Sequence, residues 1–283
     1  MSSSSATKRL NGNSMNDEQF ARLKARLQQV LGLDLEAYKE AQMRRRLTTY
    51  ISRLSDDIDT FIAELGKDEA QLKELRDMIT INVTEFFRDE AQWAQLRSTV
   101  LPDLLERGRG RLNIWSAGCS TGQEPYSIAM YLAEAGALDK STITATDFDR
   151  EALGKAKDGG PYSAEEMKGV PRAELTKHFD ETPEGFVAKA ALKKTIKFRE
   201  VNLLADKFSH GYDLVVCRNV MIYFKPDVKG DLVQRFRKTL KPDGVLFIGA
   251  TEALLGDDLA SFNRLGGNFY RNSDGDEAKT KAA

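Results

Sequence analysis

The spacing of hydrophobic residues divides the chain into two parts with different periods. From about Asn16 to Thr80, apolar residues recur every three to four positions, which predicts amphipathic helices. The first expected helix follows Asn16, which can cap it together with Gln19, and ends before Gly32. Further helices are expected over residues 35–54, 58–65 and 68–80. Residues 16–80 are therefore predicted to form a small N-terminal all-α domain.

From about Arg111 onward, short apolar runs alternate with helical patterns. Strands are expected over residues 112–116, 142–146, 196–199, 212–217 and 244–249, and helices over 124–135, 150–157, 164–178 and 229–240. Such alternation predicts a mostly parallel sheet covered by helices on both faces. The segment Lys241–Gly244 is a strong turn, and residues 262–270 are expected to close the sheet with an antiparallel hairpin. The expected fold class is α/β, with a Rossmann-like domain over residues 111–272.

Composition narrows the classes of protein. Residues 1–15 are polar and residues 273–283 small and charged, so both ends are expected to be disordered. A net charge of -1 disfavours a globally basic nucleic-acid or membrane binder, although a local patch stays open. Two cysteines and two histidines predict neither a disulfide framework nor a metal site. Without a membrane-length apolar run or a secretory signal, the protein is predicted to be cytoplasmic, with no direct membrane insertion.

Two glycines and an acidic residue indicate a nucleoside site. An expected strand runs into Gly118 and Gly122, where the absence of a Cβ would let the backbone approach a ligand, although many α/β turns contain glycine. Asp147 follows the second expected strand, where a carboxylate can accept hydrogen bonds from both ribose hydroxyls. The alternative is that Asp147 or Asp149 caps the next helix, a role for which Asp149 is well placed.

The same turn favours S-adenosylmethionine over a dinucleotide. It lacks the G-x-G-x-x-G pattern that seats a pyrophosphate on a helix N-terminus. It places Glu124 at the start of the following helix, where a second negative charge would repel phosphates. A cofactor that carries a sulfonium and an ammonium tolerates this carboxylate.

A third polar segment, Asn82–Arg88, precedes the expected sheet. Thr84 and Arg88 are four positions apart, so on a helix they would share a face. Arg88 could then pair with a ligand carboxylate in fork geometry. A structural Arg–Glu bridge between the domains is the alternative.

Four sequence blocks carry a family resemblance. They are Asn-Val-Thr-Glu-Phe-Phe-Arg at 82–88, Ser-Thr-Gly-Gln-Glu-Pro-Tyr-Ser at 120–127, Asn-Leu-Leu at 202–204, and Cys-Arg-Asn-Val-Met-Ile-Tyr-Phe at 217–224. In this order they resemble the chemotaxis receptor methyltransferase family over about residues 16–271. The resemblance implies a class I methyltransferase domain with a small antiparallel β insert at about 179–198, and a linker over residues 81–110 that contacts the cofactor. It also implies S-adenosylmethionine as cofactor and S-adenosylhomocysteine as product.

The resemblance also implies roles for individual residues. The implied cofactor-binding residues are Asn82, Thr84, Arg88, Glu124, Asp147, Asn202, Leu203, Arg218 and Asn219. Among them, Asn202 and Leu203 would lie near the adenine. Tyr223 would face the methyl group and is the expected catalytic residue together with Arg88; packing at a strand end is its alternative role. Cys119 and Cys217 are expected to be small buried residues rather than nucleophiles.

By this resemblance the reaction is methyl transfer to glutamate side chains in the cytoplasmic helical region of chemoreceptors, giving methyl esters for sensory adaptation. A methyltransferase acting on nucleic acid is the first alternative. It is disfavoured because Cys217–Met221 replaces the Asn/Asp-Pro-Pro-aromatic block expected for methylation of base amino groups. A non-catalytic cofactor-binding module is the second alternative, but it does not explain why every expected cofactor residue is present.

Two further features concern the receptor. Residues 39–53 carry five basic side chains, of which Lys39, Arg46 and Arg53 are seven positions apart and would line one rim of the apolar stripe. We expect this patch to bind an acidic receptor helix, with a solvated basic face as the alternative. The connection Asp180–Glu184 inside the expected insert is short and acidic and contains Pro183, which cannot donate a ladder hydrogen bond. This predicts that no C-terminal tether peptide of the receptor is required.

Overall fold

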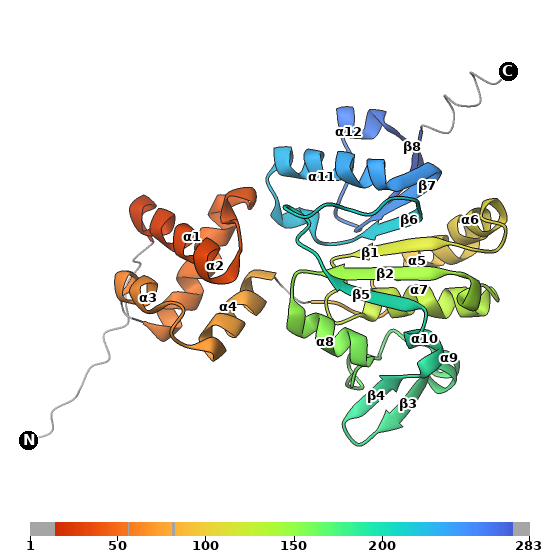
Figure 1. The fold of residues 1–283 in the computed structure, drawn as a ribbon, viewed down its shortest axis with the longest axis horizontal. Helices are drawn as coiled ribbons and strands as arrows, with labels where there is room; N and C mark the ends of the chain where they lie inside the picture. Colours follow the sequence, from red (N-terminus) through yellow and green to blue (C-terminus); the bar gives the residue numbers. More distant parts are fainter. Residues whose placement is uncertain (1–14, 56, 81–82, 274–283) are drawn as a thin grey trace, which may run out of the picture. The chain divides into compact units, whose positions relative to one another are not determined.

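A computed structural model describes residues 15–55, 57–80 and 83–273 (Figure 1). The chain forms two compact units, Met1–Ile81 and Asn82–Ala283. The expected disordered ends at 1–14 and 274–283 lie outside the described residues. Met15 and Ser273, which were expected to belong to those ends, are part of the fold. Met15 is buried, and Ser273 donates a hydrogen bond from Oγ to the Ser261 carbonyl at 2.9 Å.

The N-terminal unit is all-α, as predicted. Its helical elements are α1 (Asp17–Leu31), the 3-10 turn η1 (Leu35–Ala37), α2 (Glu40–Leu54), α3 (Ile58–Glu64) and α4 (Glu69–Thr80). The predicted capping box is present, because Asn16 and Gln19 each accept a hydrogen bond from the other's backbone N–H. Gly32 ends α1 in the left-handed region with φ 68°. The helix expected over 35–54 is interrupted, because Tyr38 and Lys39 are extended and α2 begins only at Glu40.

The second unit is built on a seven-stranded sheet in the order β5-β2-β1-β6-β7-β9-β8. Its strands are β1 (Asn113–Ala117), β2 (Thr142–Asp147), β5 (Ile196–Glu200), β6 (Tyr212–Cys217), β7 (Leu240–Ile248), β8 (Phe262–Gly266) and β9 (Phe269–Asn272). The pairs among β5, β2, β1, β6 and β7 are parallel, and β9 and β8 add the predicted antiparallel hairpin. The chain leaves β1 toward β2 and β5 and returns to its other side as β6. A switch point therefore lies between β1 and β6, where ligands of open α/β sheets bind.

Helices precede β1 and occupy connections between the strands (Figure 1). They are α5 (Glu90–Gln95), the π-helical turn η2 (Leu96–Val100), α6 (Leu101–Arg107), α7 (Gln123–Glu134), the 3-10 turn η3 (Leu138–Lys140), α8 (Arg150–Asp158), α9 (Arg172–His178), α10 (Ala190–Lys193), the 3-10 turn η4 (Met221–Tyr223), α11 (Pro226–Thr239) and α12 (Asp257–Ala260). The segment 81–110, which was expected to be a linker, contains helices. It carries α5, η2 and α6, whose residues Trp93, Leu101 and Leu104 are buried in the core of the second unit.

The helix predicted over residues 164–178 is wrong in its first half. Residues 164–169 form turns, and only Arg172–His178 is helical, as α9. Pro171 explains where this helix starts, because proline disfavours a helical conformation in the residue before it. Gly169 is packed tightly as well, since a Cβ there would lie 2.3 Å from the Phe86 carbonyl oxygen.

The β insert is smaller than expected. β3 (Phe179–Thr182) and β4 (Gly185–Ala188) form a separate antiparallel hairpin, and Ile196–Phe198 belong to β5 of the main sheet instead. Thr182 pairs with Gly185, so Pro183 and Glu184 are the two-residue turn and Pro183 takes no place in a ladder. The predicted turn at Lys241–Gly244 is present as an irregularity within β7, where Leu240 pairs with Tyr212 and Val245 with Leu214.

Within the part of the chain that the structure describes, no helix combines the length and apolar character needed to cross a membrane.

Candidate functional site

The sequence-predicted site residues that the structure describes in the second unit lie in the segment before α5 and on the turns that follow β1, β2, β5 and β6. Backbone strain concentrates around the same place. Six non-glycine residues of the described chain adopt the left-handed region, and four of them lie here, namely Phe87 (φ 52°), Asp89 (φ 63°), Ser120 (φ 47°) and Asn219 (φ 60°); the other two are Arg109 and Asp243. Such conformations persist where surrounding contacts enforce them, and they cluster at functional sites. The switch point and the strain therefore indicate the same location.

The glycines of the turn after β1 are required by the chain's own conformation and packing. Gly118 and Gly122 have φ of 81° and 99°, which L side chains rarely adopt. A Cβ on Gly118 would lie 2.5 Å from Val220 Cγ2, and one on Gly122 would lie 2.9 Å from Ala156 Cβ. The expected approach of this backbone to a nucleoside remains a prediction.

Asp147 ends β2 and is held by two backbone amides. Its carboxylate accepts hydrogen bonds from the N–H groups of Ser120 at 2.7 Å and Asp149 at 2.9 Å. Burial raises the pKa of Asp147, and these backbone N–H groups oppose the rise. A carboxylate has about four lone-pair sites, so capacity remains for two hydroxyl donors. Asp149 caps α8 by accepting from Glu151 and Ala152, as predicted, which leaves Asp147 available for a ribose.

Glu124 lies in the first turn of α7 and is buried, with a relative exposure of 8%. Ser116 Oγ donates to it at 2.7 Å, and an Arg218 nitrogen lies 3.8 Å from its other oxygen. Burial raises the pKa of Glu124, whereas the Arg218 charge and the Ser116 hydrogen bond lower it. A buried carboxylate beside a cation suits a ligand that brings an ammonium group and a carboxylate of its own.

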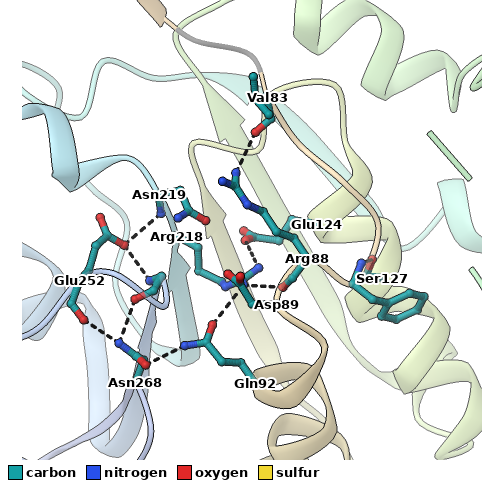
Figure 2. A network of polar contacts seen from close by, with 12 residues as sticks. Val83, Arg88, Asp89, Gln92, Glu124, Ser127, Arg218, Asn219, Glu252 and Asn268 are labelled. Carbon is teal, nitrogen blue, oxygen red and sulfur yellow. Dashed lines mark hydrogen bonds and ion pairs between the residues drawn. The ribbon is translucent and has the colours of Figure 1, made fainter. Parts of the chain in front are cut away.

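Arg218 follows β6 and is occupied largely by protein groups. One of its terminal nitrogens donates to the Arg88 carbonyl at 2.6 Å, to Asp89 at 2.9 Å and to Gln92 at 3.1 Å (Figure 2). Its guanidinium also lies over the Trp93 and Phe247 rings, 5.4 and 4.9 Å from their centroids. Burial lowers the pKa of Arg218, and Glu124 and Asp89 oppose this effect. The cofactor contact expected for Arg218 remains a prediction.

The segment before α5 is a loop, so the helical face expected for Thr84 and Arg88 is wrong. The left-handed conformations of Phe87 and Asp89 interrupt any helix there, and Ser127 Oγ accepts the Phe87 N–H at 3.2 Å. The half-buried Arg88 donates to the Val83 carbonyl at 2.9 Å, and its charge lowers the pKa of Glu124. This places Arg88 near the buried carboxylate without a helix. Asn82 lies outside the described residues.

The remaining predicted residues lie on neighbouring turns. The Val201 N–H donates to the Asp147 carbonyl at 2.9 Å, which brings the turn after β5 beside β2. In that turn Asn202 Oδ1 accepts the Leu204 N–H at 2.9 Å, and Leu203 is buried. Tyr223 ends η4 and is half-buried. The proposed roles of Asn202, Leu203 and Tyr223 remain predictions.

Some basic residues of the patch expected in the N-terminal unit are bound by other groups of the same unit. Arg46 donates to the Met78 carbonyl of α4, and Arg44 forms ion pairs of 2.7 Å with both Asp17 and Glu40. Lys39 precedes α2 rather than lying on it, and it is exposed, as is Arg53. Arg46 therefore has a structural role, whereas Lys39 and Arg53 stay accessible.

Several polar residues of the second unit were not identified from the sequence. Ser116 contacts Glu124. Asp89 and Gln92 contact Arg218, and Glu252 and Asn268 extend this network toward β7 and the β8–β9 turn (Figure 2). Glu252 could have been recognised, because it is an acidic residue near the carboxyl end of a parallel strand, as Asp147 is. Within the described ranges, no group of three or more His, Cys, Asp or Glu side chains is placed to hold a metal ion. Cys119 and Cys217 are buried, and burial raises the pKa of both thiols.

Comparison with known proteins covers both units. Residues 82–269 match the family model "CheR methyltransferase, SAM binding domain", and residues 18–80 match "CheR methyltransferase, all-alpha domain". A chemotaxis protein methyltransferase of Listeria monocytogenes is 39% identical over 241 residues, which is 85% of this chain and 92% of that protein. Its counterpart in Borreliella burgdorferi is 33% identical over 262 residues, 88% of this chain and 92% of that protein. The Escherichia coli protein is 39% identical over 161 residues, 54% of this chain and 56% of that protein.

The two family models follow the boundary between the two units, and the polar groups at the switch point fit the cofactor of this family. Asp147 retains acceptor capacity for ribose hydroxyls, and the buried Glu124 carries a negative charge beside a cationic side chain. The chain belongs to the CheR methyltransferase family and is an S-adenosylmethionine-dependent methyltransferase.

Proposed function

We propose that this enzyme transfers a methyl group from S-adenosylmethionine to glutamate side chains in the cytoplasmic helical region of chemoreceptors, which adjusts their signalling during adaptation. The main support is the match of both domains to one family, whose relatives are named chemotaxis protein methyltransferases. The site adds support, because it joins an acidic ribose acceptor, Asp147, to a buried charged pair, Glu124 and Arg218.

The chemistry needs little acid–base help from the protein. The bound cofactor supplies a methyl group on a positively charged sulfonium. An unperturbed glutamate has a pKa of about 4.3, so the acceptor is already ionised at neutral pH and no general base is required. The protein's tasks are to position the two reactants and to exclude water, which favours a reaction that neutralises opposite charges.

The proposed roles follow from the contacts of each residue. Asp147 is to accept the ribose hydroxyls, with Asn202 and Leu203 beside the adenine. Glu124 and Arg88 are to hold the charged ends of the cofactor's amino-acid portion, with Thr84, Asn219 and Arg218 completing the pocket. Tyr223 is to face the transferred methyl and orient the receptor carboxylate. The fixed amide partners of Asp147 support its role, because they orient the carboxylate before any ligand arrives.

Methyl incorporation tests the proposed reaction. Incubation with methyl-labelled S-adenosylmethionine and a receptor cytoplasmic fragment should give label that is released as methanol by mild base, as expected for a glutamate ester. Nucleic acid incubated in parallel should remain unlabelled. Base-stable label on protein, or label on nucleic acid alone, would contradict the proposal.

Cofactor affinity tests the site residues. Asp147→Ala and Arg88→Ala should each weaken binding of S-adenosylhomocysteine by about 1–3 kcal/mol, because each removes a charged hydrogen-bonding group. Isothermal titration calorimetry measures the change. Asp158→Ala is the matched control, because Asp158 is an exposed carboxylate at the end of α8. Unchanged affinity in both site variants would refute the assignment.

The accessible part of the basic patch makes a separate prediction. Lys39→Glu combined with Arg53→Glu should reduce receptor methylation at least about tenfold, because charge reversal repels an acidic helix. Affinity for S-adenosylhomocysteine should not change, since both residues belong to the N-terminal unit. Lys67→Glu, an exposed charge reversal in the same unit, is the control. Normal receptor methylation by the double variant would show that the patch is only a solvated face.

The β3–β4 hairpin supports independence from a receptor tether peptide. Both edges of β4 are already hydrogen-bonded. On one edge Phe186 exchanges two backbone hydrogen bonds of 2.8 Å with Tyr162, and on the other edge β4 pairs with β3, where Glu181 is the register partner of Phe186. A peptide could add a strand only beside β3, which is four residues long and carries Asp180 and Glu181. This edge is short and acidic.

We therefore expect a cognate receptor that lacks its last residues to be methylated at the same rate as the intact receptor. Initial rates with the two receptor forms give the comparison, and calorimetry with the isolated C-terminal peptide gives its affinity. Loss of methylation on truncation, or micromolar peptide binding, would overturn this expectation.

A further inference from the structure

A closed ring of polar contacts includes Arg218 and Asn219, the first residues of the loop that leads to Tyr223. Arg218 donates to Gln92 Oε1 at 3.1 Å, and Gln92 Nε2 donates to Asn268 Oδ1 at 2.7 Å. Asn268 Nδ2 then donates to the backbone carbonyl of Glu252 at 2.6 Å. Glu252 accepts the Asn219 N–H at 2.9 Å, which returns the ring to the residue after Arg218 (Figure 2).

Glu252 is a buried charge with unusual partners. It is 4% exposed, and its Oε2 accepts the N–H groups of both Asn219 and Gly249, at 2.9 and 2.7 Å. Burial raises the pKa of Glu252, while the backbone amides of Asn219, Gly249 and Met221 oppose the rise. A buried carboxylate costs free energy unless hydrogen bonds compensate it, and here the backbone amides of Asn219 and Gly249 supply that compensation.

Glu252 holds a bend in the backbone at Asn219. Asn219 has φ 60°, a left-handed conformation that asparagine tolerates better than most residues but that only glycine adopts freely. The bond from the Asn219 N–H to Glu252 holds the chain in this bend just before η4, which ends at Tyr223. Gly249 keeps the approach open, because a Cβ there would lie 2.7 Å from Glu252 Oε2 and 2.8 Å from the Asn219 nitrogen.

The two amide side chains fix the other half of the ring. Asn268 donates to the carbonyls of both Gly249 and Glu252, so it holds the turn from which the Glu252 side chain starts. Gln92 is buried on α5 and connects this turn to the Arg218 guanidinium. The Glu252 carboxylate therefore holds the backbone of the loop at Asn219. The Gln92 and Asn268 amides hold the Arg218 side chain, with which the loop begins.

We propose that Glu252, Gln92 and Asn268 are positioning residues that hold the loop Arg218–Tyr223 in the conformation required for methyl transfer. This inference rests on the proposed function. It assigns these three residues no contact with cofactor or receptor. They act through the residues that the loop presents.

The test combines loop exchange with steady-state kinetics. Glu252→Gln keeps one acceptor oxygen but replaces charged hydrogen bonds with neutral ones of about half the strength. Hydrogen–deuterium exchange in peptides covering residues 218–224 should then accelerate at least about fivefold, the effect of losing about 1 kcal/mol. kcat for receptor methylation should fall about tenfold, while KM for the receptor stays within about threefold. Affinity for S-adenosylhomocysteine should weaken by at least about threefold, because Arg218 and Asn219 are proposed to complete the cofactor pocket. Glu252→Ala should have a larger effect, and Gln92→Met, which cuts the opposite side of the ring, a similar one.

Asp213→Asn is the matched control. Asp213 is also a buried carboxylate, and it accepts the Asn113 N–H at 2.8 Å, but it lies in the first half of β6, away from the loop. It should lower thermal stability without changing kcat or exchange in residues 218–224. If Glu252→Ala does not fold, Glu252→Gln and Gln92→Met still decide the matter.

Three results would overturn the inference. They are unchanged loop exchange in folded ring variants, faster loop exchange with wild-type kcat, and an equal loss of kcat in Asp213→Asn. Failure of the proposed function would give a different result, because the wild-type enzyme itself would then leave receptor fragments unlabelled. In that case loop exchange and cofactor affinity, which need no receptor, still decide whether the ring holds the loop.

Discussion

The site depends on one constraint, the burial of opposite charges at the end of a parallel sheet. Glu124 and Arg218 are both nearly inaccessible, and isolated charges are costly in such surroundings. Ser116 stabilises the carboxylate, while Asp89, Gln92 and the Arg88 carbonyl stabilise the guanidinium. The partners of the guanidinium all lie in residues 88–92, whereas Ser116 lies on β1, so compensating the charges also fixes the loop before α5 against the sheet.

The strained backbone around this pair follows from the same requirement. Phe87 and Asp89 on one side and Asn219 on the other adopt left-handed conformations that local preferences oppose. Each bend has a polar partner that holds it, since Ser127 accepts the Phe87 N–H, Arg218 donates to Asp89, and Glu252 accepts the Asn219 N–H. Strain of this kind is stable only when several contacts enforce it, which preorganises the site before ligands bind.

The two units divide the proposed work. The proposed cofactor residues that the structure describes belong to the second unit, whereas the exposed basic side chains Lys39 and Arg53 belong to the first. Arg46 has a role within its own domain, because its side chain joins α2 to the Met78 carbonyl of α4. A basic residue at the right helical spacing can thus serve the packing of its own domain. The receptor surface that we propose is correspondingly smaller than the sequence pattern predicts.

Local patterns were sufficient to predict the two-domain organisation, the strands of the parallel sheet, and the positions of Asp147 and Glu124, because periodicity, caps and strand ends are local features. Contacts between distant residues determine the remainder. Thr84 and Arg88 have the spacing of a shared helical face, but contacts with Ser127 and Arg218 hold this segment as a loop. The contacts from Gln92 to Arg218 and Asn268 join residues 126 and 176 positions apart. Such pairs form only because the strand order brings β6 and the β8–β9 turn beside α5, and no spacing within a short segment encodes that order.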